Sequence, residues 1–169
     1  MLTFLKLDAE WSARLRIAER PGWLRNLAAF LAHSGDSWFW MIGLAILFVV
    51  GSYPWKLWAF KMGISIVILA ALVMAIKFTV RRRRPEGEWG ALYRKTDPHS
   101  FPSGHAARAL MLAVLAVGIG PGWLAGIMII WAPLVALARV AMGLHYLSDI
   151  LAGGIIGLAA GGLLAQALR

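Results

Sequence analysis

Cysteine is absent from this sequence, and charged residues are scarce in it. Without cysteine the chain forms neither disulfides nor thiolate metal sites. Only 15% of the 169 residues are Asp, Glu, Lys or Arg, whereas 60% are hydrophobic and the mean hydropathy is +0.72. In soluble domains about a quarter of the residues are charged, and their helices need polar faces. The composition therefore disfavours a compact soluble helical protein.

Five apolar segments approach or exceed the roughly 20 residues that a helix needs to cross a bilayer. They are 37–52, 57–79, 105–119, 122–142 and 146–168, of which the first and third are short. Several Trp residues lie at the ends of these segments, where indole rings prefer the membrane interface: Trp38, Trp40, Trp55, Trp58 and Trp123. We predict an all-α fold in which residues 35–169 form a polytopic transmembrane bundle within a single domain, 1–169.

The first 34 residues differ from the rest, because charged and apolar side chains alternate there. We predict that residues 1–34 form an amphipathic arm lying in the headgroup zone of the membrane, broken in two by Pro21-Gly22. The alternative is a sixth span near residues 14–33, so the expected number of spans is five to six.

The longest polar segment, 81–104, joins two apolar spans and is expected to be a surface loop beside the membrane. Most charges that make up the net charge of +9 flank the spans, so we expect no nucleic-acid partner. We interpret Arg81, Arg82 and Arg83 as an interfacial basic patch for anionic headgroups.

Three clusters in the second half of the chain carry residues able to do chemistry. They are Lys77 with Arg84-Pro85, then Pro102-Ser103-Gly104-His105, then Arg139 with His145 and Asp149. The order of the spans brings all three clusters to the same end of the bundle. Ionisable residues at such a depth are costly unless they face a polar cavity, so the sequence predicts a functional site there.

Five of these residues suit the binding of a phosphate. Lys77, Arg84 and Arg139 can clamp its nonbridging oxygens, and the arginine fork favours bidentate contacts. Ser103 is a plausible N-cap, and Gly104 leaves backbone N–H groups open to an anion at the helix N-terminus.

Three further residues of the clusters suit phosphoryl transfer. His145 and Asp149 are four apart at the expected start of a helix, so they should share one face, and Asp149 can orient the imidazole. His145 is then the predicted nucleophile, forming a phosphohistidine. His105 is predicted to protonate the leaving oxygen and afterwards to activate water.

The pattern K-x6-RP, PSGH and R-x5-H-x3-D resembles that of the type 2 phosphatidic acid phosphatase (PAP2) superfamily. This family includes membrane lipid phosphatases and soluble vanadium haloperoxidases. The resemblance spans residues 77–149 and implies a PAP2/haloperoxidase-like core, the same roles for the residues above, and no metal or other cofactor. One departure is Ala138, where the family usually has Ser; we expect altered phosphate affinity from it rather than lost activity.

The resemblance implies a metal-independent phosphatase that removes a terminal phosphate from a membrane lipid. The candidates are phosphatidylglycerol phosphate, phosphatidate and polyprenyl mono- or diphosphates. The alternatives are a noncatalytic transporter or scaffold that retains the pocket, and a vanadate-dependent oxidant, which the hydrophobicity and small size disfavour. The expected setting is a bacterial or archaeal cell membrane. Family habit favours an extracytoplasmic site, whereas the distribution of Lys and Arg favours a cytoplasmic one.

Other residues have less specific interpretations. Arg108, one turn after His105, is a candidate for contact with the phosphate or the headgroup, and His33 and His99 are expected to be solvated. We expect close helix packing at the glycines of the last span, Gly153, Gly154, Gly157, Gly161 and Gly162.

Overall fold

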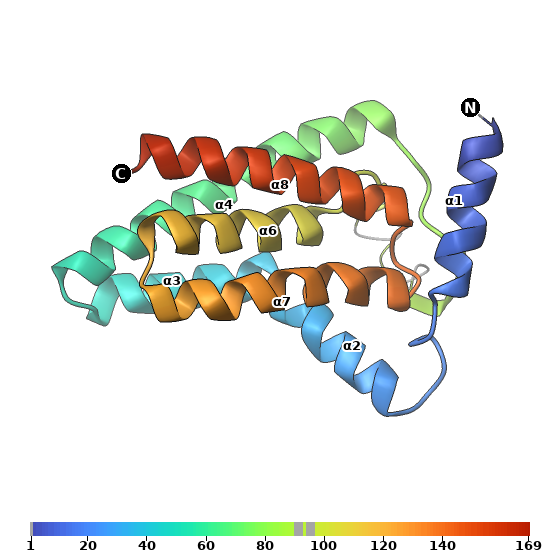
Figure 1. The fold of residues 1–169 in the computed structure, drawn as a ribbon, viewed down its shortest axis with the longest axis horizontal. Helices are drawn as coiled ribbons and strands as arrows, with labels where there is room; N and C mark the ends of the chain where they lie inside the picture. The colour runs from blue at the N-terminus through green and yellow to red at the C-terminus, as the bar shows by residue number, and fades with distance from the viewer. Residues whose placement is uncertain (1, 90–92, 94–96) are drawn as a thin grey trace.

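Over the residues that the computed structural model describes, 2–89, 93 and 97–169, the chain consists of seven α-helices. They are α1 (Leu2–Arg14), α2 (Trp23–Ser34), α3 (Ser37–Val50), α4 (Tyr53–Val80), α6 (Gly104–Ile119), α7 (Gly122–Ala141) and α8 (Leu147–Ala167). Figure 1 shows α3, α4, α6, α7 and α8 along the long axis, α1 crossing one end of this bundle, and α2 projecting from it. The predicted all-α fold is confirmed.

Five helices, α3, α4, α6, α7 and α8, correspond to the five predicted apolar spans. The prediction that five to six segments cross the membrane is not confirmed. Only α4, α7 and α8 are long and apolar enough to cross a bilayer by themselves. The number rises to four if α2 and α3, which are bent by 53° at their junction, form one broken span. Helix α6 has 16 residues and α3 has 14, fewer than the roughly 20 that a crossing needs.

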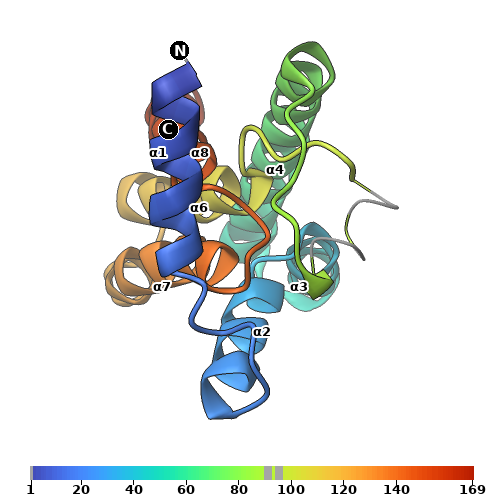
Figure 2. The same ribbon diagram turned by 90° about the vertical axis from the view of Figure 1, so that its right-hand side faces the viewer.

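The N-terminal arm forms two helices separated around Pro21-Gly22, as predicted, and the first of them supports α8. Buried Asp8 accepts hydrogen bonds from the Ser148 N–H at 3.1 Å and the Ser148 hydroxyl at 2.5 Å. The Ser12 hydroxyl accepts the Leu147 N–H at 2.9 Å. These contacts satisfy N–H groups that the first turn of a helix leaves without intrahelical partners. Figure 2 shows α1 lying in front of α8.

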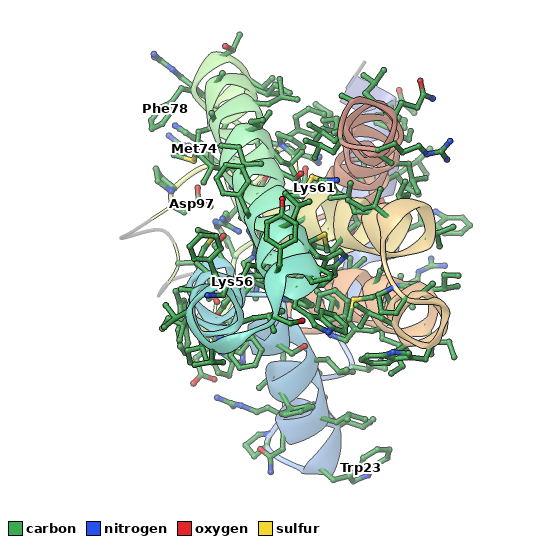
Figure 3. All side chains as sticks on the ribbon, turned by 90° about the vertical axis from the view of Figure 1, so that its left-hand side faces the viewer. Trp23, Lys56, Lys61, Met74, Phe78 and Asp97 are labelled. Carbon is green, nitrogen blue, oxygen red and sulfur yellow. The ribbon has the colours of Figure 1, made fainter. Side chains whose placement is uncertain are left out.

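The second helix of the arm, α2, packs on α7. Ala28 and Ala32 form a buried cluster with Ala138 and Met142. At its other end Trp23 projects away from the bundle (Figure 3) and is 72% exposed. The location of the arm in the headgroup zone stays a prediction.

Helix α6 forms the centre of the bundle, and glycines allow α8 to approach it closely. Met111, Leu112 and Leu115 of α6 are fully buried. A Cβ added at Gly157 would collide with the Ala107 carbonyl, and similar collisions at Gly153, Gly154 and Gly161 confirm the predicted close packing. Gly162 is the exception, since a Cβ there would meet no atom within 4 Å.

We predict that Gly157→Val destabilises the bundle by about 1–3 kcal/mol or more, because the side chain forces α6 and α8 apart. The measurement is the thermal unfolding midpoint of the protein in detergent. Gly162→Val is the matched control, since it changes helix propensity equally but enters open space. Equal losses in the two variants would contradict the close approach at Gly157.

Candidate active site

The three sequence clusters converge at the end of the bundle where α4 and α7 finish and α6 and α8 begin. The Ser103 N–H donates to the Asp149 carbonyl at 3.0 Å, which joins the starts of α6 and α8. Arg84 Nη1 donates to the Leu144 carbonyl at 3.0 Å. These bonds join the three clusters beside a cavity that Lys77, His105 and His145 line.

The cavity has a volume of about 460 Å³ and combines a polar region with an apolar wall. Lys77, His105 and His145 are among its polar lining residues, and Ile66 and Leu69 of α4 contribute to its apolar wall. A cavity of this kind can hold a charged group at one end and a hydrocarbon chain at the other.

All three predicted phosphate-binding cations are buried, with Lys77 3%, Arg84 4% and Arg139 1% exposed. One carboxylate oxygen, Oδ2 of Asp97, accepts from Lys77 Nζ at 2.5 Å and from Arg84 Nη2 at 2.6 Å. Asp97 thus lies between two cations that the sequence assigns to phosphate. It lines the cavity together with Met74 on the same side of α4 (Figure 3).

Asp97 is held there by charge. Burial raises the pKa of its carboxyl, but the hydrogen bond and charge of Lys77, followed by the charge of Arg84, outweigh burial and leave the pKa below 3.8. The carboxylate is therefore ionised at neutral pH. No sequence signal points to this role, because Asp97 is one of many charged residues in a polar loop.

Arg139 has donors that no described residue satisfies. Its Nη1 lies 3.4 Å from the Tyr93 hydroxyl, and its guanidinium is 4.8 Å from the centre of the Tyr93 ring. Its Nε and Nη2 are buried and have no hydrogen-bond partner within 2–89, 93 and 97–169. Buried donors left unpaired cost about 1–3 kcal/mol each, so this guanidinium is poised to receive an anion.

The contact with Arg84 fixes the tautomer of His145, with the lone pair on Nε2. Arg84 Nη1 lies 3.1 Å from this nitrogen, and arginine can only donate, so Nε2 must accept and Nδ1 carries the proton. Nδ1 lies 3.5 Å from Asp149 Oδ2. Burial, helped by the charges of Arg84 and Arg139 and opposed by Asp149, lowers the pKa of His145 to about 3. The imidazole is neutral at physiological pH, as a nucleophile requires.

The prediction that His145 and Asp149 share a helix face is wrong in its geometry. His145 lies in the turn before α8, which Gly143 makes with φ 68°. Asp149 is the third residue of the helix, and its Oδ2 accepts the Tyr146 N–H at 2.9 Å. This interaction caps the N-terminus of α8, which begins after Tyr146, and the carboxylate still reaches back towards the imidazole.

The second cluster begins α6 as predicted. The Ser103 hydroxyl is the N-cap and accepts the Ala106 N–H at 3.4 Å, and Gly104 lines the cavity. His105 also lines it, and its Nε2 lies 2.6 Å from Asp36 Oδ1. Sequence reasoning missed Asp36, which comes from the α2–α3 junction about seventy residues away and belongs to no motif.

The interpretation of Arg82 as part of a headgroup-binding patch is wrong. Its side chain is only 17% exposed and donates to Asp149 Oδ1 at 2.8 Å and to Asp8 Oδ2 at 2.7 Å. It therefore links α1 to the carboxylate behind His145. Arg81 and Arg83 are exposed, so the headgroup interpretation stays open for them.

Three further predictions concern Arg108 and two histidines. All three guanidinium nitrogens of Arg108 donate to the α2–α3 junction, to the Gly35 carbonyl and the Ser37 hydroxyl. His33 is half-exposed and lies 3.0 Å from Asp36. His99 is not simply solvated: it is half-buried against Phe78, and its carbonyl accepts from Lys77 at 2.8 Å.

Within the part of the chain that the structure describes, no group of three or more His, Cys, Asp or Glu side chains is placed to hold a metal ion.

Comparison with known proteins gives the family. The family model described as "PAP2 superfamily" matches residues 58–169, and the chain belongs to this family. The fold resembles the crystal structure of a transmembrane PAP2 type phosphatidylglycerolphosphate phosphatase from Bacillus subtilis. The TM-score is 0.74, the identity is 22%, and the match covers 99% of this chain and 87% of that one. The apolar helices and this fold indicate an integral membrane protein.

Two characterised relatives are phosphatases. The undecaprenyl-diphosphatase of Sulfolobus acidocaldarius is 29% identical over 141 residues, which are 79% of this chain and 66% of that protein. The decaprenylphosphoryl-5-phosphoribose phosphatase of Mycobacterium tuberculosis is 30% identical over 148 residues, or 87% of this chain and 81% of that protein. The chain thus spans slightly under two thirds of the first protein's length.

We predict that Asp97→Asn strengthens the binding of phosphate-like anions, because it removes the carboxylate that occupies Lys77 and Arg84. Inhibition by orthovanadate should become tighter by on the order of tenfold, equivalent to about 1.4 kcal/mol. The measurement is the inhibition constant in detergent. Glu86→Gln is the matched control, because it removes an equal charge from an exposed position in the same loop. Unchanged or weaker inhibition in Asp97→Asn would contradict competition by Asp97.

Proposed function

We propose that this protein hydrolyses the terminal phosphate of a membrane lipid, without a metal ion, through a phosphohistidine formed on His145. The observation that carries this proposal is the neutral imidazole of His145, with its lone pair on Nε2 among three buried cations. The characterised relatives, which are phosphatases of lipid phosphates, support the reaction class.

In the first step the phosphate displaces Asp97, and its oxygens bind Lys77, Arg84 and Arg139. Arg84 then turns its donors from His145 Nε2 to the phosphate, which frees the lone pair for attack. The bond from Nε2 to phosphorus forms as the bond from phosphorus to the ester oxygen breaks. His105 gives a proton to that oxygen, and the Asp149 carboxylate stabilises the positive charge that develops on His145.

In the second step water attacks the phosphorus of the phosphohistidine. His105, now neutral, takes the proton from this water, and the bond between phosphorus and Nε2 breaks. Inorganic phosphate leaves, and both histidines return to their starting protonation states. The three cations stabilise the charge on the phosphoryl oxygens throughout, which is the main contribution that a protein makes to this chemistry.

The substrate is an amphiphile, because the cavity joins Lys77 and the two histidines to an apolar wall on α4. Phosphatidylglycerol phosphate, phosphatidate and polyprenyl mono- or diphosphates all have the required headgroup and tail. We also propose that the site lies at the interface on the extracytoplasmic side of the cell membrane. In this arrangement α3 and α6 complete the bundle as short crossings, giving five spans.

The proposal is tested by phosphate release from lipid mono- and diphosphates by purified protein in detergent containing EDTA. The wild type should release phosphate, and His145→Ala should reduce kcat by at least about a thousandfold, since the residue is the nucleophile. Acid-quenched wild type given radiolabelled substrate should carry label on a histidine.

Thermal unfolding of His145→Ala serves as the control for folding. Phosphate release that survives in a folded His145→Ala protein would refute the assignment of the nucleophile. Absence of release by the wild type from every lipid phosphate would favour a noncatalytic role for the pocket.

A further inference from the structure

The junction between α2 and α3 brings a carboxylate to the histidine that faces the leaving group. Asp36 Oδ1 lies 2.6 Å from His105 Nε2, and both residues line the cavity. Because Asp36 engages Nε2, Nδ1 is the ring nitrogen that can face the ester oxygen. His105 and Asp36 therefore form a closer pair than His145 and Asp149, whose nearest atoms are 3.5 Å apart, and the proposed mechanism places the two pairs on opposite sides of the reacting phosphorus.

The rest of the junction holds Asp36 in this position. Its other oxygen, Oδ2, lies 3.0 Å from His33 Nδ1 and accepts from Trp38 Nε1 at 3.2 Å. The backbone on either side is anchored to α6, because Arg108 donates to the Gly35 carbonyl and the Ser37 hydroxyl. The carboxylate has both oxygens engaged and is only 14% exposed, so it is fixed rather than free to rotate into solvent.

We propose that Asp36 positions His105 as a general acid for an alcohol leaving group, so that the site prefers phosphate monoesters of lipid alcohols over lipid diphosphates. This inference rests on the proposed function. A carboxylate on one imidazole nitrogen fixes the tautomer and stabilises the imidazolium that must be present before the proton is given. Asp36 is thus a positioning residue that acts through His105.

The leaving group decides how much this arrangement matters. Cleavage of a monoester expels an alkoxide, a very strong base, so the reaction depends on proton donation from His105 Nδ1. Cleavage of a diphosphate expels a phosphate monoester, which is a weak base and leaves without full protonation. Its negative charge also lies near the Asp36 carboxylate, although Arg108 offsets part of this repulsion.

The test compares three substrates with identical hydrocarbon tails: dodecyl phosphate, dodecyl diphosphate and a nitrophenyl phosphate carrying a dodecyl chain. The wild type should have a higher kcat/KM on dodecyl phosphate than on dodecyl diphosphate. Asp36→Asn should lower kcat/KM on dodecyl phosphate by about 10–100-fold, within the usual range for loss of general acid catalysis. The diphosphate and the nitrophenyl ester, whose leaving groups need little protonation, should change by no more than about threefold on the same basis.

The controls separate this role from a structural one. Glu10→Gln removes a carboxylate from the exposed face of α1 and should leave all three rates unchanged. A loss of activity in Asp36→Asn that is equal for all three substrates indicates a structural role and overturns the inference, while the proposed function stands.

The wild-type comparison keeps the inference testable if Asp36→Asn does not fold. A wild type that prefers the diphosphate also overturns it. Absence of release from every substrate by the wild type refutes the proposed function itself.

Discussion

The site depends on the balance of charge among cations that the fold buries at one end of the bundle. Lys77, Arg84 and Arg139 are all nearly inaccessible, and like charges at this proximity repel strongly where water is excluded. Asp97 neutralises part of this charge through Lys77 and Arg84, whereas two nitrogens of Arg139 have no partner among the described residues. In the proposed mechanism the incoming phosphate replaces Asp97 and also satisfies Arg139, because it offers more negative charge and more acceptor oxygens than one carboxylate.

The supports of this arrangement come from distant parts of the chain. Close packing at Gly153 and Gly157 fixes the start of α8 against the start of α6, where Ser103 meets Asp149. Behind Asp149, Arg82 connects to Asp8 of α1. The N-terminal helices are thus part of the site: α1 supports the carboxylate beside His145, and the α2–α3 junction supplies Asp36 to His105.

Sequence alone predicted the helices of the bundle, because long apolar runs broken by polar turns define them, and it identified the cluster residues by their chemistry and spacing. Sequence alone missed Asp36, Asp97 and the pair of Arg82 and Asp8. Each of these residues stands alone in a junction, loop or helix, and only tertiary folding decides which residue it contacts. The sequence placed His145 at the turn before the last predicted span, 146–168, but not its geometry relative to Asp149. A spacing of four residues suggested one helix face, whereas the capping interaction of Asp149 begins the helix after His145.

The most direct test of this account is a crystal structure with orthovanadate, which mimics the phosphoryl group in transfer. The account predicts a bond from vanadium to Nε2 of His145, vanadate oxygens on Lys77, Arg84 and Arg139, and an Asp97 carboxylate that has moved away from the cations. Vanadate bound elsewhere, with Asp97 still between Lys77 and Arg84 and Nε2 of His145 unbonded, would contradict it.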